Sequence, residues 1–372
     1  MQATNKVSLK IITAAIVLST ILLSSCNTSG DDSSSDFDSE WLIPSSQIVD
    51  GGPGKDGIPS LEDPDFIDLS EVTFIPDDRM VLGLRIGDEI RAYPHQILDW
   101  HEIVNDEVDG KSVALLFCPV TGTGMAWDRN INGTVTEFGV SGLLYKNNLI
   151  PYDRNTDSNW SQMLKQSVNG TLSGLHTSVY TVVETSWANW KELYPDSKVL
   201  STNTGFSRNY SGFTYGPDYS TNNNRILFPI ENDDNRLPRK ERVLGVIDEL
   251  ENGSDSTVKA FPLADFGAGF SVIREQVGTT EYIIVGSSDR NISAAFLPQF
   301  NDGSFAEGTF TSLPNQLPAV MEDESGNLYD LFGYVVDGPD EGKHLAPANA
   351  YTGYWFGWAD FFPDIEIYRP AD

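Results

Sequence analysis

The chain has 372 residues, with 24 Lys and Arg against 54 Asp and Glu, which gives a formal net charge of −30 at pH 7. Hydrophobic residues make up 40% and charged residues 21%, a composition typical of a globular protein rather than a disordered one. The negative charge argues against binding to nucleic acid and against electrostatic docking on anionic membranes. With only two cysteines, Cys26 and Cys118, a disulfide framework is excluded.

The N-terminus has the pattern of an export signal. Lys6 and Lys10 precede an apolar run over residues 11–23, which is too short to cross a hydrocarbon core of ~30 Å. The run ends in the letters LSSC at residues 23–26, which resemble the bacterial lipobox. We therefore expect residues 1–25 to be a lipoprotein signal peptide. An ordinary secretory leader that ends near a cysteine is the alternative.

Cleavage at this position makes Cys26 the lipidated N-terminal residue. Residues 26–55 begin with a polar, acidic stretch of low complexity, which is typical of a flexible stalk. Acyl chains contribute ~0.8 kcal/mol per buried methylene to membrane attachment. We expect a bacterial cell-envelope protein on the outer membrane or the cell surface, with the membrane contacted through the lipid alone.

An internal duplication organises the rest of the chain. Many residues recur after a shift of 168 positions, and the pairs include Pro94 and Pro262, Gly170 and Gly338, His176 and His344, Trp187 and Trp355, Trp190 and Trp358. We define copy A as residues 56–205, the connector as residues 206–224 and copy B as residues 225–372.

The pattern within each copy predicts mostly strands. In copy A, residues 80–85 and 89–93 alternate around Gly87-Asp88, which indicates a hairpin. The apolar run 113–118 predicts a strand buried on both faces. A second hairpin is expected from residues 124–128 and 134–140, and short helices after Pro94 and over residues 187–194. The expected fold is mainly β with a few short helices, in two related β-rich halves.

The duplication separates architecture from candidate function. Residues that occur in both copies, such as the paired tryptophans and His176 with His344, are interpreted as structural. His95 aligns with Leu263, so we rank it low as a functional residue. The polar residues His101, Glu102, Asp106 and Cys118 are confined to copy A and are the catalytic candidates.

The same region carries a family resemblance. The strings are RAYP (residues 91–94), WHEIVND (100–106), CPVTGT (118–123), SGLLYKNNL (141–149) and YDRNTDSNWSQ (152–162). They resemble the signature of a bacterial and archaeal family of secreted proteins and lipoproteins, catalogued as a domain of unknown function. The resemblance extends over nearly the whole chain after the stalk and implies no activity or cofactor.

One chemical hypothesis for copy A is a reactive thiol. Cys118 ends a predicted buried strand, and strand-to-turn junctions often display nucleophiles. His101 could accept the thiol proton, with Glu102 or Asp106 orienting the imidazole. A second hypothesis is a copper or zinc site at Cys118 and His101, because thiolate and imidazole suit such ions. A buried, inert Cys118 is the structural alternative.

The third hypothesis, which we favour, is binding without chemistry. Many aromatic side chains and several polar ones could line a cleft in copy A that holds a glycan or a small polar ligand. The candidate binding residues are Asn105, Thr121, Thr123, Ser141, Asn147, Asp153, Ser158 and Gln162. Sequence motifs of NTPases, elbow-type serine hydrolases, zincins and Rossmann enzymes do not occur in the chain.

Overall fold

The computed structural model describes residues 41–249, 256–306 and 308–370. The expected signal peptide and Cys26 lie outside these residues, as does most of the expected stalk. All the residues that the structure describes belong to one compact unit. None of the helices in the described ranges has the length and apolar character needed to span a bilayer.

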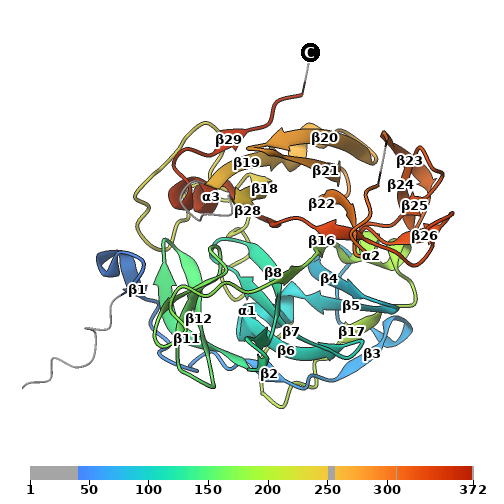
Figure 1. The fold of residues 1–372 in the computed structure, drawn as a ribbon. Coiled ribbons are helices and arrows are strands. Elements are labelled where there is room, and N and C mark those ends of the chain that lie inside the picture. The colour runs from blue at the N-terminus through green and yellow to red at the C-terminus, as the bar shows by residue number, and fades with distance from the viewer. Residues whose placement is uncertain (1–40, 250–255, 307, 371–372) are drawn as a thin grey trace, which may run out of the picture. The chain divides into compact units, whose positions relative to one another are not determined.

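The structure is mainly β, as expected, and its few helices are short (Figure 1). The α-helices of the described chain are α1 (His95–His101), α2 (Trp187–Leu193) and α3 (Trp355–Phe361). Short 3-10 helices are η1 (Ser45–Gln47), η2 (Leu69–Glu71) and η3 (Leu263–Phe266). Each α-helix directly follows a strand: α1 follows β5, α2 follows β16 and α3 follows β28.

The first half of the chain contains three larger sheets and a two-stranded one. The first sheet has the order β16 (Val182–Ser186), β4 (Met80–Ile86), β5 (Glu89–Pro94), β17 (Lys198–Leu200), β3 (Phe66–Asp68). The second has the order β15 (Val179–Tyr180), β8 (Thr123–Asp128), β7 (Lys111–Cys118), β6 (Ile103–Val108), β2 (Leu61–Glu62). The third has the order β1 (Ile48–Asp50), β11 (Phe138–Tyr145), β12 (Asn148–Asp153), β13 (Asn159–Ser161), β14 (Gln166–Asn169), and β9 (Asn130–Ile131) pairs with β10 (Thr134–Val135).

The second half contains three sheets of four strands. Their orders are β28 (Ala350–Tyr354), β18 (Arg242–Glu249), β19 (Ser256–Pro262), β29 (Glu366–Ile367); then β20 (Ser271–Val277), β21 (Thr280–Ser287), β22 (Ile292–Phe300), β27 (Leu345–Pro347); and finally β23 (Phe310–Gln316), β24 (Ala319–Asp323), β25 (Leu328–Tyr329), β26 (Val335–Asp337).

The two halves repeat one strand order. The four strands β16-β4-β5-β17 correspond in sequence and pairing to β28-β18-β19-β29, including the parallel last pair in each sheet. Contacts between the halves are reciprocal, since β16 packs near β22 while β28 packs near β8. This arrangement is what a duplicated unit requires; the duplication itself stays a prediction.

A glycine and a tryptophan fix the same close contact in each half. A Cβ on Gly83 in β4 would lie 2.0 Å from the Trp190 ring of α2, and a Cβ on Gly245 in β18 would lie 2.3 Å from the Trp358 ring of α3. Both tryptophans are fully buried. Each short helix is thus held on its sheet by an indole ring, because only glycine leaves room for that ring.

The local patterns in copy A predicted most of its strands. The hairpin of β4 and β5 and the buried strand β7 occur where they were expected. The second expected hairpin is different, because β8 pairs with β7 and β15, and Asn132-Gly133 closes the separate small pair β9–β10. The turn residues were therefore recognised, but their strand partners were not.

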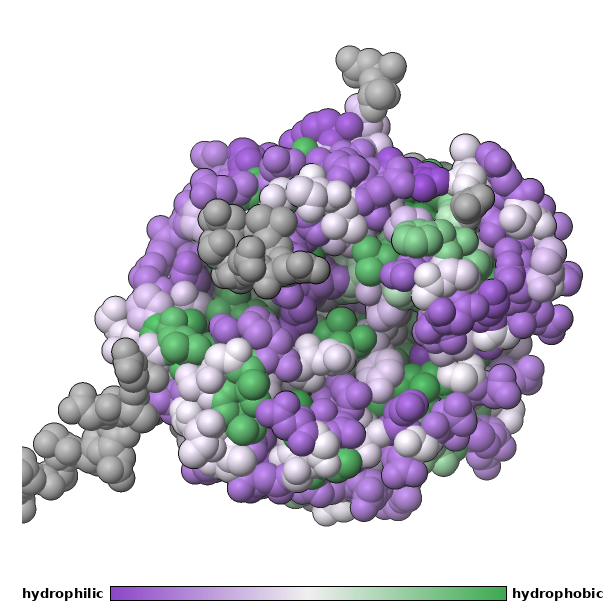
Figure 2. Space-filling view, viewed as in Figure 1, coloured by the Kyte–Doolittle hydropathy of each residue, from purple (hydrophilic) through white to green (hydrophobic). Residues whose placement is uncertain are grey.

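The connector, residues 206–224, consists of turns and bends without helix or strand. Tyr210 and Tyr219 are buried, while Phe206 and Phe213 are exposed. The surface is largely hydrophilic, with scattered apolar patches, in the view of Figure 2. The buried tyrosines anchor the connector to copy A, and this contact forms one wall of the pocket described next.

Candidate functional site

A pocket of about 320 Å³ lies where α1, β16, β18, β28 and the connector meet. Pro119 and Gly122, from the turn between β7 and β8, also line it. A main-chain hydrogen bond of 2.8 Å from Tyr354 N to Thr121 O joins this turn to β28. The pocket therefore draws its walls from both halves of the chain, not from copy A alone.

His95, the first residue of α1, presents an unsatisfied imidazole nitrogen to this region. Its Nε2 is buried and has no hydrogen-bond partner among the described residues, and it lies 4.0 Å from Glu184 Oε1. One ring face packs on Phe117, with 4.2 Å between centroids. Burial, reinforced by the positive charge of Arg242, lowers the pKa of His95 to about 3. The imidazole is therefore neutral at pH 7 and can both donate and accept a hydrogen bond.

Asp99 lies one helical turn after His95, on the same face of α1. Its carboxyl makes no hydrogen bond with any described residue, and burial raises its pKa to about 7, against the opposing influence of Arg79. Gln96 adds a buried Oε1 without a partner in the described chain. The first turns of α1 thus direct several unsatisfied polar groups toward the pocket, where a ligand could pair with them.

Glu184, which lies beside His95, forms a buried ion pair with Arg242. Arg242 Nη2 donates to Glu184 Oε2, and Arg242 Nη1 donates to Gly122 O at 2.7 Å. Gly122 has φ +62, and a Cβ there would lie 2.5 Å from Arg242 Nη1, so this turn requires glycine. Burial raises the pKa of Glu184, although Arg242 opposes that effect. Because the two charges compensate each other, the pair adds little net charge to the pocket.

Five aromatic rings also line the pocket. Phe117 comes from β7, Tyr354 from β28, and Phe213, Tyr215 and Tyr219 from the connector. The Tyr219 hydroxyl donates to Val120 O at 2.8 Å, which fixes its ring against copy A. Flat apolar faces beside convergent polar groups are typical of small-molecule sites.

The structure does not bring His101 and Cys118 together. His101 Nδ1 donates to Pro59 O at 2.8 Å, so its Nε2 accepts from the Tyr210 hydroxyl at 2.7 Å. Both ring nitrogens are therefore engaged away from the thiol. Burial lowers the pKa of His101, which keeps this neutral tautomer.

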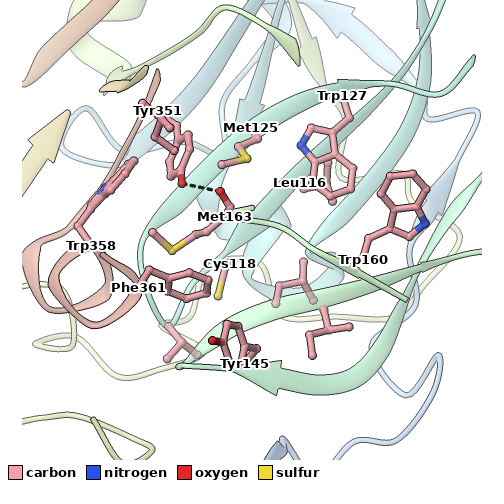
Figure 3. Packing of buried hydrophobic residues seen from close by; sticks show 14 of the residues in the cluster. Leu116, Cys118, Met125, Trp127, Tyr145, Trp160, Met163, Tyr351, Trp358 and Phe361 are labelled. Atoms are coloured by element: carbon pink, nitrogen blue, oxygen red, sulfur yellow. Dashed lines mark hydrogen bonds between the residues drawn. The ribbon is translucent and has the colours of Figure 1, made fainter. Parts of the chain in front are cut away.

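Cys118 lies in the apolar core. Its side chain is among Tyr145, Met163 and Phe361 in Figure 3, and Sγ donates to Asn147 O at 3.7 Å. Burial, and secondarily the charge of Glu102, raise the pKa of the thiol. A nucleophilic cysteine needs the opposite shift, so the geometry around Cys118 gives no support to a Cys–His pair.

The two carboxylates expected beside the thiol have separate surroundings. Asp106 accepts hydrogen bonds of 2.6 Å from both Arg91 Nη1 and the Tyr93 hydroxyl, which is a closed structural cluster. Glu102 ends α1 with φ +57 and accepts from the Tyr215 hydroxyl at 3.5 Å. Burial raises the pKa of Glu102 to about 8, so it is mostly protonated at pH 7. Glu102 lies behind the pocket wall that Tyr215 forms.

Six of the expected binding residues, five of them buried and Ser141 half-buried, form hydrogen bonds within copy A or with residues 228–229. Asn105 exchanges two hydrogen bonds with the backbone of Phe138 (2.8 and 2.9 Å). Ser141 donates to Ile150 O at the bulge of β11. Asn148 joins two of the others, because its Nδ2 donates to Thr121 Oγ1 at 3.0 Å and to Gln162 Oε1 at 2.8 Å. Gln162 Nε2 in turn donates to Thr123 O at 3.2 Å. Asn147 contacts the backbone at Phe228 and Pro229, and its Nδ2 donates to Pro229 O at 2.9 Å.

Asp153 and Ser158 belong to a turn that copy B repeats. Asp153 N donates to Ser158 O at 3.0 Å, and the Asp153 carboxylate accepts from Trp160 Nε1 at 3.2 Å. In copy B, Asp323 N donates to Asn327 O at 3.1 Å, and its carboxylate accepts from the Tyr329 hydroxyl at 2.6 Å. This repetition indicates a structural role for both aspartates. None of the eight expected binding residues lines the pocket.

The donor set for a metal ion is incomplete in the described chain. Across residues 41–249, 256–306 and 308–370, no three or more His, Cys, Asp or Glu side chains come together in a way that could hold an ion. The copper or zinc hypothesis at Cys118 and His101 therefore gains no supporting geometry.

Sequence reasoning missed the residues that do form the pocket. His95 was ranked low because copy B has Leu263 in its place. However, a polar residue that occurs in copy A alone was also the criterion by which we chose the other candidate functional residues. Two further signals were present: Asp99 follows His95 by four residues on a predicted helix, and Glu184 corresponds to Thr352 in copy B. Arg242 and the connector tyrosines carried no comparable pattern.

Residues 55–365 match the sequence model of a family whose description is "Protein of unknown function (DUF3179)". The chain belongs to this family, as the resemblance of its motifs had indicated. No curated protein and no solved structure matches it.

Proposed function

We propose that the protein binds a small, uncharged, hydroxyl-rich ligand, of the size of a mono- or disaccharide, in the pocket between α1 and the connector. The observation that carries this proposal is the convergence of polar groups without partners, His95 Nε2 and Gln96 Oε1, on a pocket with aromatic walls. Buried polar groups are normally hydrogen-bonded, so such a set is costly unless a ligand or water satisfies it.

The charge balance of the pocket favours a neutral ligand. Glu184 and Arg242 compensate each other, as do the opposite charges of Asp78 and Arg79, which also line the pocket. His95 is neutral, and the Asp99 carboxyl has a pKa of about 7. The protein as a whole carries a charge of −30, which disfavours anions. The volume of about 320 Å³ lies at the lower end of the range for ligand sites, which suits one or two sugar rings.

A saccharide panel tests this proposal by isothermal calorimetry and thermal shift. We expect at least one neutral sugar to bind, and His95→Ala and Asp99→Asn each to weaken that binding tenfold or more, since each removes a hydrogen-bonding group in the pocket. His176→Ala and Asp196→Asn are matched controls, because both residues are exposed and outside the pocket. Unchanged affinity in the two pocket variants would remove the site from consideration.

We also propose that the protein is a lipid-anchored protein of the bacterial cell envelope. The support is the LSSC sequence at residues 23–26 after an apolar run, followed by an acidic stretch. Cells fed an alkyne fatty acid should label the full-length protein, and Cys26→Ser should abolish both the label and detergent-phase partitioning. Labelling that persists in Cys26→Ser would contradict anchoring at this residue.

A further inference from the structure

A buried lysine lies directly behind the aromatic wall of the pocket. Lys240, just before β18, is 6% exposed, and its Nζ has no hydrogen-bond partner within the described ranges. Its main-chain N donates to Asn223 Oδ1 at 2.7 Å, so the position of the residue is fixed. The amine therefore has a defined place in the core and no polar group to satisfy it.

Three aromatic rings enclose this amine. Nζ lies 3.4 Å from the ring centroid of Tyr219, 4.5 Å from that of Tyr354 and 4.9 Å from that of Phe356. Tyr219 and Tyr354 also line the pocket, whereas Lys240 does not. The amine is thus in contact with two residues of the pocket wall.

Tyr219 is the ring nearest to the amine and also lines the pocket. Its hydroxyl makes one hydrogen bond, to Val120 O at 2.8 Å, and its ring packs against Tyr215 and Tyr354. The residue belongs to the connector, which contains neither helix nor strand. A carbonyl compound in the pocket therefore reaches the amine only if this ring moves.

We propose that Lys240 forms an imine with a small neutral aldehyde or ketone that enters through the pocket. The amine nitrogen attacks the carbonyl carbon, a C–N bond forms as the C=O π bond breaks, and the resulting carbinolamine loses water to give C=N. Both N–H hydrogens of the neutral amine leave with the carbonyl oxygen, so no oxidant or reductant is required. This inference uses the pocket as an entrance but does not rest on sugar binding.

The surroundings of the amine act on its charge in opposite directions. Burial lowers the pKa of Lys240 to about 7; Cys118 opposes the shift and Arg225 adds to it. The titratable or charged groups around Nζ are Cys118 from β7, Tyr219 from the connector, Arg225 at the start of copy B and Tyr354 from β28. The ring faces favour the ammonium form, so the pH dependence of the reaction shows which influence prevails.

A second lysine provides an internal control. Lys165 is also 6% exposed, and burial also lowers its pKa, but its Nζ is paired with Glu249 Oε1 at 3.1 Å. Lys165 and Lys240 therefore share burial and differ in the partner of the amine. Lys198, whose side chain is 56% exposed, represents an ordinary surface lysine.

The test is reductive trapping on the unaltered full-length protein. Glycolaldehyde and sodium cyanoborohydride are added across pH 6–10, and the adduct at each lysine is measured by peptide mass spectrometry. At pH 7 a lysine of pKa 7 has about a thousandfold more neutral amine than one of pKa 10.4. Allowing for burial, we expect at least tenfold more adduct on Lys240 than on Lys165 or Lys198, with half-maximal reaction near pH 7.

Two results would overturn the proposal. One is a Lys240 adduct no greater than that of Lys165 at every pH, which means the amine is inaccessible. The other is a Lys240 profile that rises only above pH 9, which means the rings hold an ammonium ion. Lys240→Arg should remove the adduct and leave those of other lysines unchanged, and Tyr219→Phe should accelerate trapping. A failure of sugar binding leaves all these readings unaffected.

Discussion

The two halves of the chain share an architecture and differ in their polar interior. Both contain a four-stranded sheet of the same order and a helix fixed by a glycine–tryptophan contact. Copy A places His95 and Glu184 where copy B has Leu263 and Thr352. Copy A thus has two polar side chains that line a pocket, His95 without a hydrogen-bond partner at Nε2 in the described chain and Glu184 paired with Arg242, whereas copy B has an apolar or a small residue at the corresponding positions.

The largest expected effects on stability come from the glycine–tryptophan contacts that both halves share. Trp190→Ala and Trp358→Ala should each lower the free energy of unfolding by about 3–5 kcal/mol, because each empties the space beside a strand glycine. Equilibrium unfolding in urea measures this. Similar losses would support equivalent roles for α2 and α3, whereas a loss below about 1 kcal/mol in either would show that the two helices are not equivalent.

The polar interior of copy A should make stability fall as pH rises. The folded-state pKa values of Asp99 and Glu102, about 7 and about 8, lie above the ordinary values of 3.8 and 4.5. Their protonated forms therefore favour folding, and this contribution is present below about pH 4 and lost progressively up to about pH 8. The slope is about 1.4 kcal/mol per pH unit for each carboxyl that is ionised only in the unfolded chain.

Substitution of these carboxyls isolates their effect. Asp99→Asn should flatten the stability profile between about pH 4 and 7, and Glu102→Gln between about pH 4.5 and 8. Urea midpoints at one-unit pH intervals provide the measurement. A variant profile parallel to that of the unaltered protein would show that the carboxyl is not buried in its neutral form.

The repeated turns should respond alike. Asp153→Ala and Asp323→Ala each remove a carboxylate that accepts hydrogen bonds from a buried ring side chain and from the turn backbone. We expect each to cost about 1–3 kcal/mol, because buried donors lose their acceptor. Thermal unfolding compares the pair directly. A much larger effect for Asp153 on ligand binding than on stability would assign it a functional role that Asp323 lacks.

The smallest effect is expected where copy A is given the residue of copy B. His95→Leu replaces a buried nitrogen without a partner in the described chain by an apolar side chain. The free energy of unfolding should stay the same or rise by up to about 1 kcal/mol. Chemical denaturation measures this change, and a loss greater than 1 kcal/mol would show that the imidazole is satisfied by a partner such as an ordered water.

Local patterns were sufficient to predict much of the fold. The alternation around Gly87 identified β4 and β5, and the apolar run identified β7, because these features depend on neighbours along the chain. The helices expected after Pro94 and over residues 187–194 occur as α1 and α2 for the same reason. The partner of β8 was not predictable, since strand pairing depends on contacts between distant segments.

The site was harder to predict because its contacts are distant in sequence. His101 is engaged by Tyr210, 109 residues later, and Glu184 by Arg242, 58 residues later. A periodic pattern of residues along the chain gives no information about such distant pairs. The candidates were correct residue types in the motif-rich region, but their proximity in sequence gave no information about which side of α1 or β7 each side chain occupies.

The position of β28 makes the pocket a feature of the whole chain. Tyr354 joins the turn at Thr121 and belongs to the same pocket lining as His95 and Glu184. A chain truncated before residue 350 keeps His95 and Glu184 but loses Tyr354, so neither half of the chain forms this pocket by itself.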